Sequence, residues 1–208
     1  MEDINLINLE DVKRLQQAKK HRISLQSWTW AYYSARIFKY DGSINSILKN
    51  SCEEVIKGIN NRTLTYESKS QRVNEFGNST EEWLAGKLVS NGIDSKTLGN
   101  AYPDIRFYYN DKWYYIECKT QSNICADTSF RTFYASTPEP KTIKRKDIQD
   151  GFHLLAVFET KGKGKNVKYT GNYRIYDLVD FTFMDYGSIH QGCPKDYLKL
   201  NIVCQNTN

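Results

Sequence analysis

Hydrophobic and polar positions alternate along the middle and end of the chain in a pattern that predicts β-strands. The segments 103–109 and 113–120 are rich in aromatic and β-branched residues and flank Asn110-Asp111, two residue types that accept the positive φ angles of a two-residue hairpin turn. The continuous apolar run 152–159 is typical of a central strand buried on both faces. Strands are therefore expected at 103–109, 113–120, 129–135, 152–159 and 167–178.

Helical patterns precede these strands. In the segment 79–92, Ser79 is an expected N-cap with Glu82 completing a capping box, and Gly92 is an expected C-terminal stop. The first 78 residues are expected to be mostly helical, and apolar residues recur at helical spacing in 43–60. A further helix is indicated at 9–20, the aromatic segment 25–40 is compatible with a buried helix or a strand, and 60–78 reads as a polar connector.

This order of elements predicts an α/β or α+β protein in which helices flank one central sheet. Three regions are expected. Residues 1–78 form a mainly helical N-terminal region, residues 79–183 form the core, and residues 184–208 form a tail that packs on the core.

The register of the expected hairpin brings ionisable side chains together. If Asn110-Asp111 is the turn, Tyr109 opposes Lys112, and counting back along both strands places Asp104 opposite Glu117. Directly opposed residues share a face of the sheet, with Cβ atoms about 4.5–5.5 Å apart. Lys119 lies two residues after Glu117 and shares that face. A three-residue loop would break this register.

Two adjacent carboxylates repel each other, and a divalent cation removes the conflict. Oxygen ligands of this kind suit Mg²⁺ or Mn²⁺ better than zinc. The alternative is purely structural: Lys119 could form a salt bridge with both acids across the strands. The hairpin pattern alone leaves both readings open.

Composition and charge narrow the class of protein. The chain has 208 residues, 39% of them hydrophobic, and a net charge of +5. It contains no apolar run of 18 residues and no apolar stretch near its acidic start, which predicts a protein without a membrane span or a secretory signal. Five scattered cysteines without a CxxC pair predict neither a disulfide framework nor a structural zinc site, and they favour the cytoplasm.

The positive charge is concentrated in one part of the chain. Residues 141–175 hold nine Lys and Arg residues against three acidic ones. Clustered positive charge attracts polyanions such as nucleic acid. A solvated, lysine-rich surface is the alternative explanation.

Pro103-Asp104, followed by Glu117-x-Lys119 on the neighbouring strand, resembles the signature of the PD-(D/E)xK nuclease superfamily, which includes many type II restriction endonucleases. The resemblance implies a restriction-endonuclease-like core in 79–183. It also implies that Asp104 and Glu117 are metal ligands, that Lys119 is catalytic, and that Mg²⁺ is the cofactor, with Mn²⁺ as a substitute. The family's helical glutamate corresponds to Glu81 or Glu82. Glu81 is favoured because it shares the inward helix face with Leu84 and Leu88.

The resemblance further implies a Mg²⁺-dependent endodeoxyribonuclease that hydrolyses double-stranded DNA, as a sequence-specific type II enzyme of a restriction-modification system. A homodimer and a cognate DNA methyltransferase are the expected partners, and residues 1–78 are expected to supply dimer and DNA contacts. Other nucleases of the fold (resolvase, repair or mobile-element enzymes), a non-catalytic DNA-binding protein and an unrelated α+β protein remain alternatives. The expected DNA contacts are Gln121, Arg131, Lys141, Lys144, Arg145 and Lys146.

Overall fold

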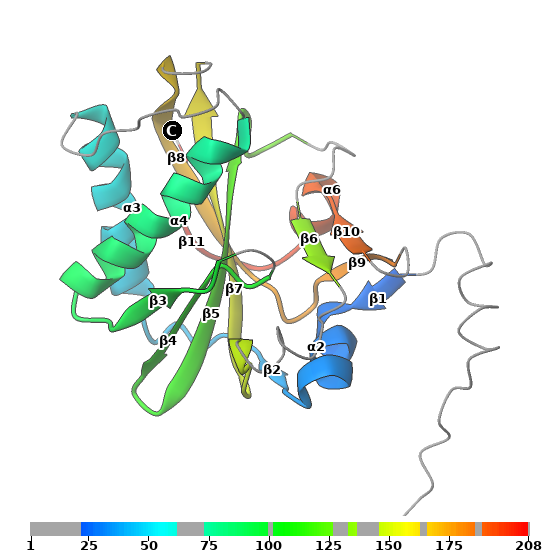
Figure 1. Cartoon of the computed structure of the whole chain (residues 1–208). Helices are drawn as coiled ribbons and strands as arrows, with labels where there is room; N and C mark the ends of the chain where they lie inside the picture. The colour runs from blue at the N-terminus through cyan, green and yellow to red at the C-terminus, as the bar shows by residue number, and fades with distance from the viewer. Residues whose placement is uncertain are drawn as a thin grey trace, which may run out of the picture.

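Two β-sheets organise the part of the chain that the structure describes, which comprises residues 22–61, 73–99, 102–126, 133–136, 146–162, 166–185 and 189–207 of a computed structural model (Figure 1). The central sheet has the strand order β11-β8-β7-β5-β4-β3, and β2 pairs with β7 beside this path. Its strands are β2 (Ile37–Phe38), β3 (Ser95–Thr97), β4 (Ile105–Tyr109), β5 (Lys112–Gln121), β7 (Gly151–Lys161), β8 (Lys168–Asp177) and β11 (Ile202–Asn206).

The central sheet is mixed. Strands β2 and β5 run parallel to β7, whereas all other neighbouring strands of this sheet pair in antiparallel orientation. The apolar run predicted as a central strand is β7, and its first eight residues are all buried. The predicted fold class, a mixed α+β protein with helices flanking a mixed central sheet, is confirmed.

The predicted hairpin register is also confirmed. Tyr109 pairs with Lys112, and the ladder runs back to Ile105 opposite Ile116. Asn110 and Asp111 have φ angles of 49° and 59°, as a type I′ turn requires. The turn therefore sets which face each side chain of β4 and β5 occupies.

Helices α3 (Asn45–Asn60) and α4 (Val73–Ser90) cover one face of the central sheet (Figure 1). Their apolar residues and those of β4, β5 and β7 form one continuous core, which includes Leu48, Cys52, Val55, Leu84, Leu88, Ile105, Ile116 and Leu154. The N-terminal helical region and the nuclease core expected from the sequence thus share one hydrophobic core.

The predicted start of the helix at Ser79 is wrong. Helix α4 already includes Val73, so Ser79 lies inside it and cannot act as an N-cap; the predicted boundary between residues 78 and 79 falls within this helix. Phe76 and Thr80 are buried at helical spacing before Leu84, and the Phe76 ring packs 5.1 Å from that of Tyr169. Burial of this earlier turn extends the helix past the local capping signal. The predicted stop is confirmed, with Gly92 at a φ of 88°.

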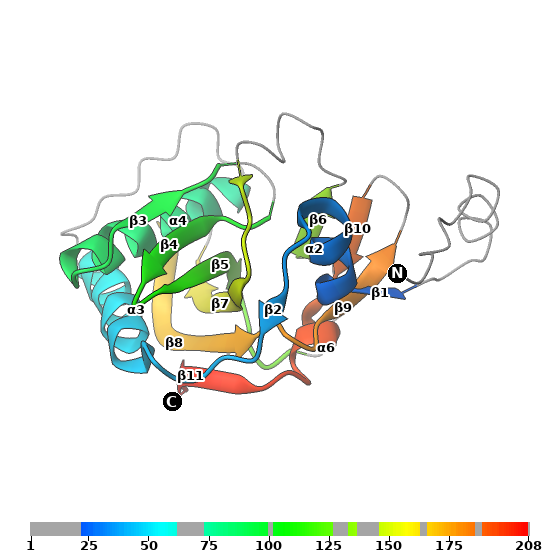
Figure 2. The same ribbon diagram turned by 90° about the horizontal axis from the view of Figure 1, so that it is seen from below.

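A second sheet with the order β1-β9-β10-β6 lies on the other side of the molecule, together with α2 (Leu25–Tyr33) and α6 (Pro194–Tyr197) (Figure 2). Its strands are β1 (Arg22–Ser24), β6 (Phe133–Ser136), β9 (Thr182–Asp185) and β10 (Ile189–Gly192). The expectation of a single sheet is therefore wrong. The strand predicted at 129–135 is β6, which pairs with β10, and its Phe133 ring packs 4.7 Å from that of Phe181.

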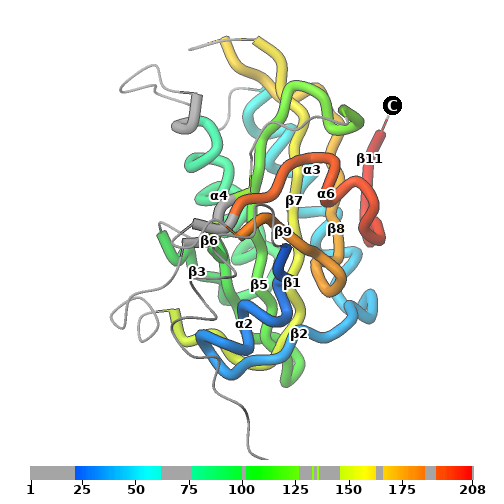
Figure 3. Tube along the Cα trace, turned by 90° about the vertical axis from the view of Figure 1, so that its right-hand side faces the viewer, coloured from blue at the N-terminus to red at the C-terminus, as the bar shows by residue number. Residues whose placement is uncertain are grey.

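Strands β2 and β11, which lie near the two ends of the described chain, both join the central sheet. The aromatic segment 25–40 contains α2 and the short strand β2, so both alternatives for it hold in part. In the tail, β11 extends the central sheet beside β8 (Figure 3). The helix predicted at 9–20 lies outside the described residues. No helix in the described part of the chain is long and apolar enough to cross a membrane.

His153 on β7 lies in the protein core, and a histidine near the start of an apolar strand is typically a buried, hydrogen-bonded core residue. Its side chain is fully buried, and Nδ1 is hydrogen-bonded to the hydroxyl group of Tyr102. Burial lowers the pKa of His153 to about 3, far below the value of roughly 6.5 expected in the unfolded chain. The imidazole is therefore neutral in the folded protein at pH 7.

This histidine should make the folded protein sensitive to acid. Between pH 6.5 and 3 the unfolded chain binds a proton that the folded protein excludes, so the stabilisation is complete above about pH 6.5 and decreases as the pH falls. At pH 5 the loss should be about 2 kcal/mol. Urea unfolding of the wild type and of His153→Gln at pH 7 and pH 5 measures it. An equal pH dependence in both proteins would refute this assignment.

Candidate active site

The end of β4 and the middle of β5 bring the predicted acidic residues together. Asp104 lies just before the first residue of β4, and its backbone N–H donates to the carbonyl of Ile116 at 3.2 Å. Its carboxylate Oδ2 accepts a hydrogen bond from the backbone N–H of Cys118 at 2.8 Å. The backbone pairing of β4 and β5 ends at Ile105 and Ile116, and the hydrogen bond from Cys118 holds the Asp104 carboxylate beside β5 past that point.

Lys119 contacts both carboxylates. Its Nζ lies 2.6 Å from Glu117 Oε1 and 3.6 Å from Asp104 Oδ2, and it also donates to the carbonyl of Cys118 at 2.9 Å. Asp104 and Glu117 are both buried, with 7% and 2% of their surfaces exposed. The convergence of these three side chains expected from the hairpin register is present in the structure.

The charges of Asp104, Glu117 and Lys119 shift the pKa values of the neighbouring groups in this site. Burial, reinforced by the charge of Asp104, raises the pKa of Glu117 to about 8. Burial acts to lower the pKa of Lys119, but the charges of Glu117 and Asp104 outweigh it and raise that pKa above its usual range. Lys119 is therefore an ammonium ion at neutral pH. It can stabilise negative charge, but it is poorly suited to act as a general base.

Glu81 and Glu82, which are neighbours on α4, occupy different environments. Burial and the neighbouring Asp104 raise the pKa of Glu81 to about 8, and Lys119 and Lys146 act on it in the opposite direction. Glu82 is exposed and lines a shallow hollow with β3 on the outer side of the helix. Of these two, Glu81 is the one whose charge interacts with Asp104.

The carboxylate pair fits a divalent cation. Glu117 Oε1 is bonded to Lys119, whereas Oε2 is buried and has no hydrogen-bond partner among the described residues. Mg²⁺ is commonly held by one or two carboxylates, with water and substrate phosphate completing its shell. Within the described ranges, no group of three or more His, Cys, Asp and Glu side chains is placed to hold a metal. Asp104 and Glu117 thus supply two carboxylates of the kind that hold such an ion.

Of the expected DNA contacts, two lie within the described residues. Gln121 ends β5 on the face that carries Glu117 and Lys119, and its Nε2 is buried without a described hydrogen-bond partner. Lys146 is fully buried, and its ammonium donates to the carbonyl of Pro103 at 2.9 Å. It is not part of an exposed basic surface, which corrects the expectation for this residue. Arg131, Lys141, Lys144 and Arg145 lie outside the described residues.

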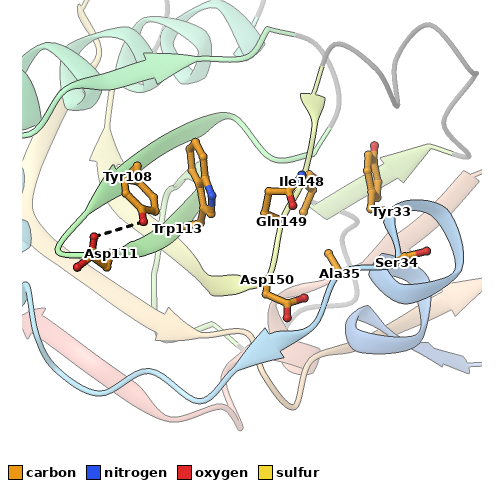
Figure 4. A pocket seen from close by; sticks show the side chains of 9 residues that line it. All are labelled: Tyr33, Ser34, Ala35, Tyr108, Asp111, Trp113, Ile148, Gln149 and Asp150. Carbon is orange, nitrogen blue, oxygen red and sulfur yellow. Dashed lines mark hydrogen bonds between the residues drawn. The ribbon is translucent and has the colours of Figure 1, made fainter.

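A second concave surface lies at the turn end of the hairpin, away from the acidic residues (Figure 4). It has a volume of about 420 Å³, and the sequence pattern had not pointed to it. Its lining residues are Tyr33, Ser34, Ala35, Tyr108, Asp111, Trp113, Ile148, Gln149 and Asp150. The two acidic residues that line this surface are separate from the Asp104–Glu117 pair. Asp150 forms an ion pair with Arg36, and Asp111 lies on the hairpin turn.

Comparison with known proteins shows which family this chain resembles. The model of the type II restriction enzyme MjaV family matches residues 31–184, a span that includes α3, α4 and the whole acidic site. The type II restriction enzyme MjaV of Methanocaldococcus jannaschii is 33% identical over 156 residues, with 67% of each chain covered.

Proposed function

Because this chain belongs to the MjaV family of type II restriction enzymes, it is a site-specific deoxyribonuclease, and we propose that Asp104, Glu117 and Lys119 form its active site. The observation that carries the proposal is the contact of Lys119 with both buried carboxylates, while one oxygen of Glu117 has no hydrogen-bond partner among the described residues. A purely structural salt bridge would leave no such buried oxygen to be satisfied.

Asp104 and Glu117 are the residues that would hold Mg²⁺, with Mn²⁺ as a substitute. When bound, the ion supplies a more acidic water and neutralises charge on the phosphate. The hairpin supplies the positioning, since Asp104 is fixed by the Cys118 N–H and Glu117 by Lys119. A carboxylate pair held in this way needs little rearrangement to bind a cation.

Lys119 acts as a fixed positive charge in this scheme. Its ammonium orients the attacking water and stabilises the negative charge that develops on the phosphate oxygens. Glu81 adds a third carboxylate close to Asp104 and accepts a hydrogen bond from water at the site. The role of Lys119 is supported by its contacts with both carboxylates and by its raised pKa, which keeps it protonated. The role of Glu81 is supported by its electrostatic interaction with Asp104.

The substrate that we propose is double-stranded DNA, with phosphates contacted by Gln121 and by the basic residues Arg131, Lys141, Lys144 and Arg145. A homodimer would match the two-fold symmetry of a palindromic site. The enzyme would work in the cytoplasm within a restriction-modification system, beside a DNA methyltransferase that protects the same sequence.

The direct test is incubation of the purified protein with plasmid DNA and Mg²⁺. We expect discrete fragments whose sequenced ends share one short motif, and no cleavage in EDTA. Absence of cleavage of all duplex substrates with both Mg²⁺ and Mn²⁺ would overturn the proposal. A ladder without a common end sequence would contradict site specificity.

Glu81 and Glu82 provide a matched pair of variants on one helix. Glu81→Gln should lower kcat about tenfold or more, because the carboxylate beside Asp104 is lost. Glu82→Gln should leave cleavage unchanged, since this side chain is exposed on the outer side of α4. Single-turnover cleavage of a cognate duplex measures both. Equal effects of the two substitutions would remove Glu81 from the site.

A further inference from the structure

Lys146 is an unusual residue for the interior of a protein. Its side chain is fully buried, although burial of an ammonium ion is costly unless its donors are satisfied. Its Nζ donates to the carbonyl of Pro103 at 2.9 Å and approaches the carbonyl of Gly99 at 3.3 Å. Both acceptors belong to the backbone that leads into Asp104.

A second set of hydrogen bonds joins the same two segments, with the donor now on the strand that follows Asp104. The guanidinium of Arg106 on β4 donates to the backbone carbonyl of Lys146 and, at 3.3 Å, to that of Asp147. Lys146 therefore binds the residue before Asp104, while Arg106, two residues after Asp104, binds the backbone of Lys146. These two reciprocal contacts form a clamp around the short segment that carries the Asp104 carboxylate.

The positive charge of Lys146 also acts on Glu81, one of the acidic residues near the site. It acts to lower the pKa of Glu81, in opposition to burial and Asp104. Asp104, Glu117 and Glu81 bring three carboxylates to the site, and Lys119 compensates part of this charge. Lys146 thus favours the charged form of Glu81.

We propose that Lys146 is a positioning residue for metal binding, which holds the Pro103–Asp104 backbone so that the Asp104 carboxylate faces Glu117. The inference rests on the proposed function and deepens it. It differs from a role in contacting DNA, because the ammonium is directed into the protein and not toward solvent. It also predicts an effect that appears in the absence of DNA.

The test measures Mn²⁺ binding to the free protein from the electron paramagnetic resonance signal of unbound Mn²⁺. Lys146→Met keeps the length of the side chain and removes its charge and its donors. We expect Mn²⁺ to bind about tenfold more weakly or worse, as for residues that orient metal ligands, with kcat lowered and KM for DNA little changed. Lys57→Met, on the exposed surface of α3, is the matched control and should bind Mn²⁺ like the wild type.

Folding is checked by circular dichroism and a cooperative melt. If Lys146→Met does not fold, Lys146→Gln carries the test. Its amide offers donors that help the interior to fold, but the side chain is one atom shorter and uncharged and cannot reproduce the contacts with Pro103 and Gly99, so we expect Mn²⁺ binding weaker than that of the wild type. Wild-type Mn²⁺ affinity in a folded Lys146 variant, or equal weakening in Lys57→Met, would overturn the inference. If the wild type itself neither binds Mn²⁺ nor cleaves DNA, the proposed function fails. If the wild type does both and the Lys146 variant binds Mn²⁺ equally well, only the inference about Lys146 fails.

Discussion

Glu117→Gln should reduce cleavage of the cognate DNA site by about 10³-fold or more, in the range of the largest single-residue effects on charge-stabilising groups. The substitution preserves size and removes the buried negative charge. Its amide can no longer form the 2.6 Å ion pair with Lys119, and Oε2 of the carboxylate is lost as an anionic ligand. The change therefore affects both proposed functions of this side chain.

The measurement is the single-turnover rate of cleavage with Mg²⁺, compared with the affinity for the same duplex in Ca²⁺. Binding to DNA should persist, because the protein surface is unchanged. Glu53→Gln, at the i,i+4 pair with Lys57 on α3, is a matched substitution away from the site and should cleave normally. Wild-type cleavage by Glu117→Gln would exclude this residue from the active site.

Lys119→Met should reduce cleavage by about 10²–10³-fold, because the fixed charge that stabilises the phosphate is lost. Its effect on metal binding should be opposite to that of Glu117→Gln. Without Lys119, the buried carboxylates of Asp104 and Glu117 repel each other uncompensated in the metal-free protein. The variant should therefore be less stable without metal and should gain more from binding one.

Thermal melting with and without Mn²⁺ separates these effects. The increase in melting temperature on adding Mn²⁺ should be larger for Lys119→Met than for the wild type, and small or absent for Glu117→Gln. Lys112→Met, on the same strand at an exposed ion pair with Asp41, serves as the control. If Lys119→Met cleaves at the wild-type rate, the lysine has only a structural role.

The sequence alone determined the local geometry of the hairpin. Asn110 and Asp111 are residue types that accept positive φ, and the two-residue period of a strand then decides the face of every side chain on β4 and β5. Asp104, Glu117 and Lys119 converge for this reason. The helix stop at Gly92 and the buried strand β7 were predictable in the same way, because each depends on neighbouring residues along the chain.

Only the tertiary structure decided what depends on distant partners. Strand β6 joined a second sheet because Phe133 is buried against Phe181, and α4 begins before its local capping signal because Phe76 packs on Tyr169. Lys146 belongs to a sequence that reads as a solvated basic run, yet its ammonium is buried against the Pro103 carbonyl. Local sequence patterns report periodicity and turn chemistry, whereas burial is the result of contacts between segments far apart in the chain.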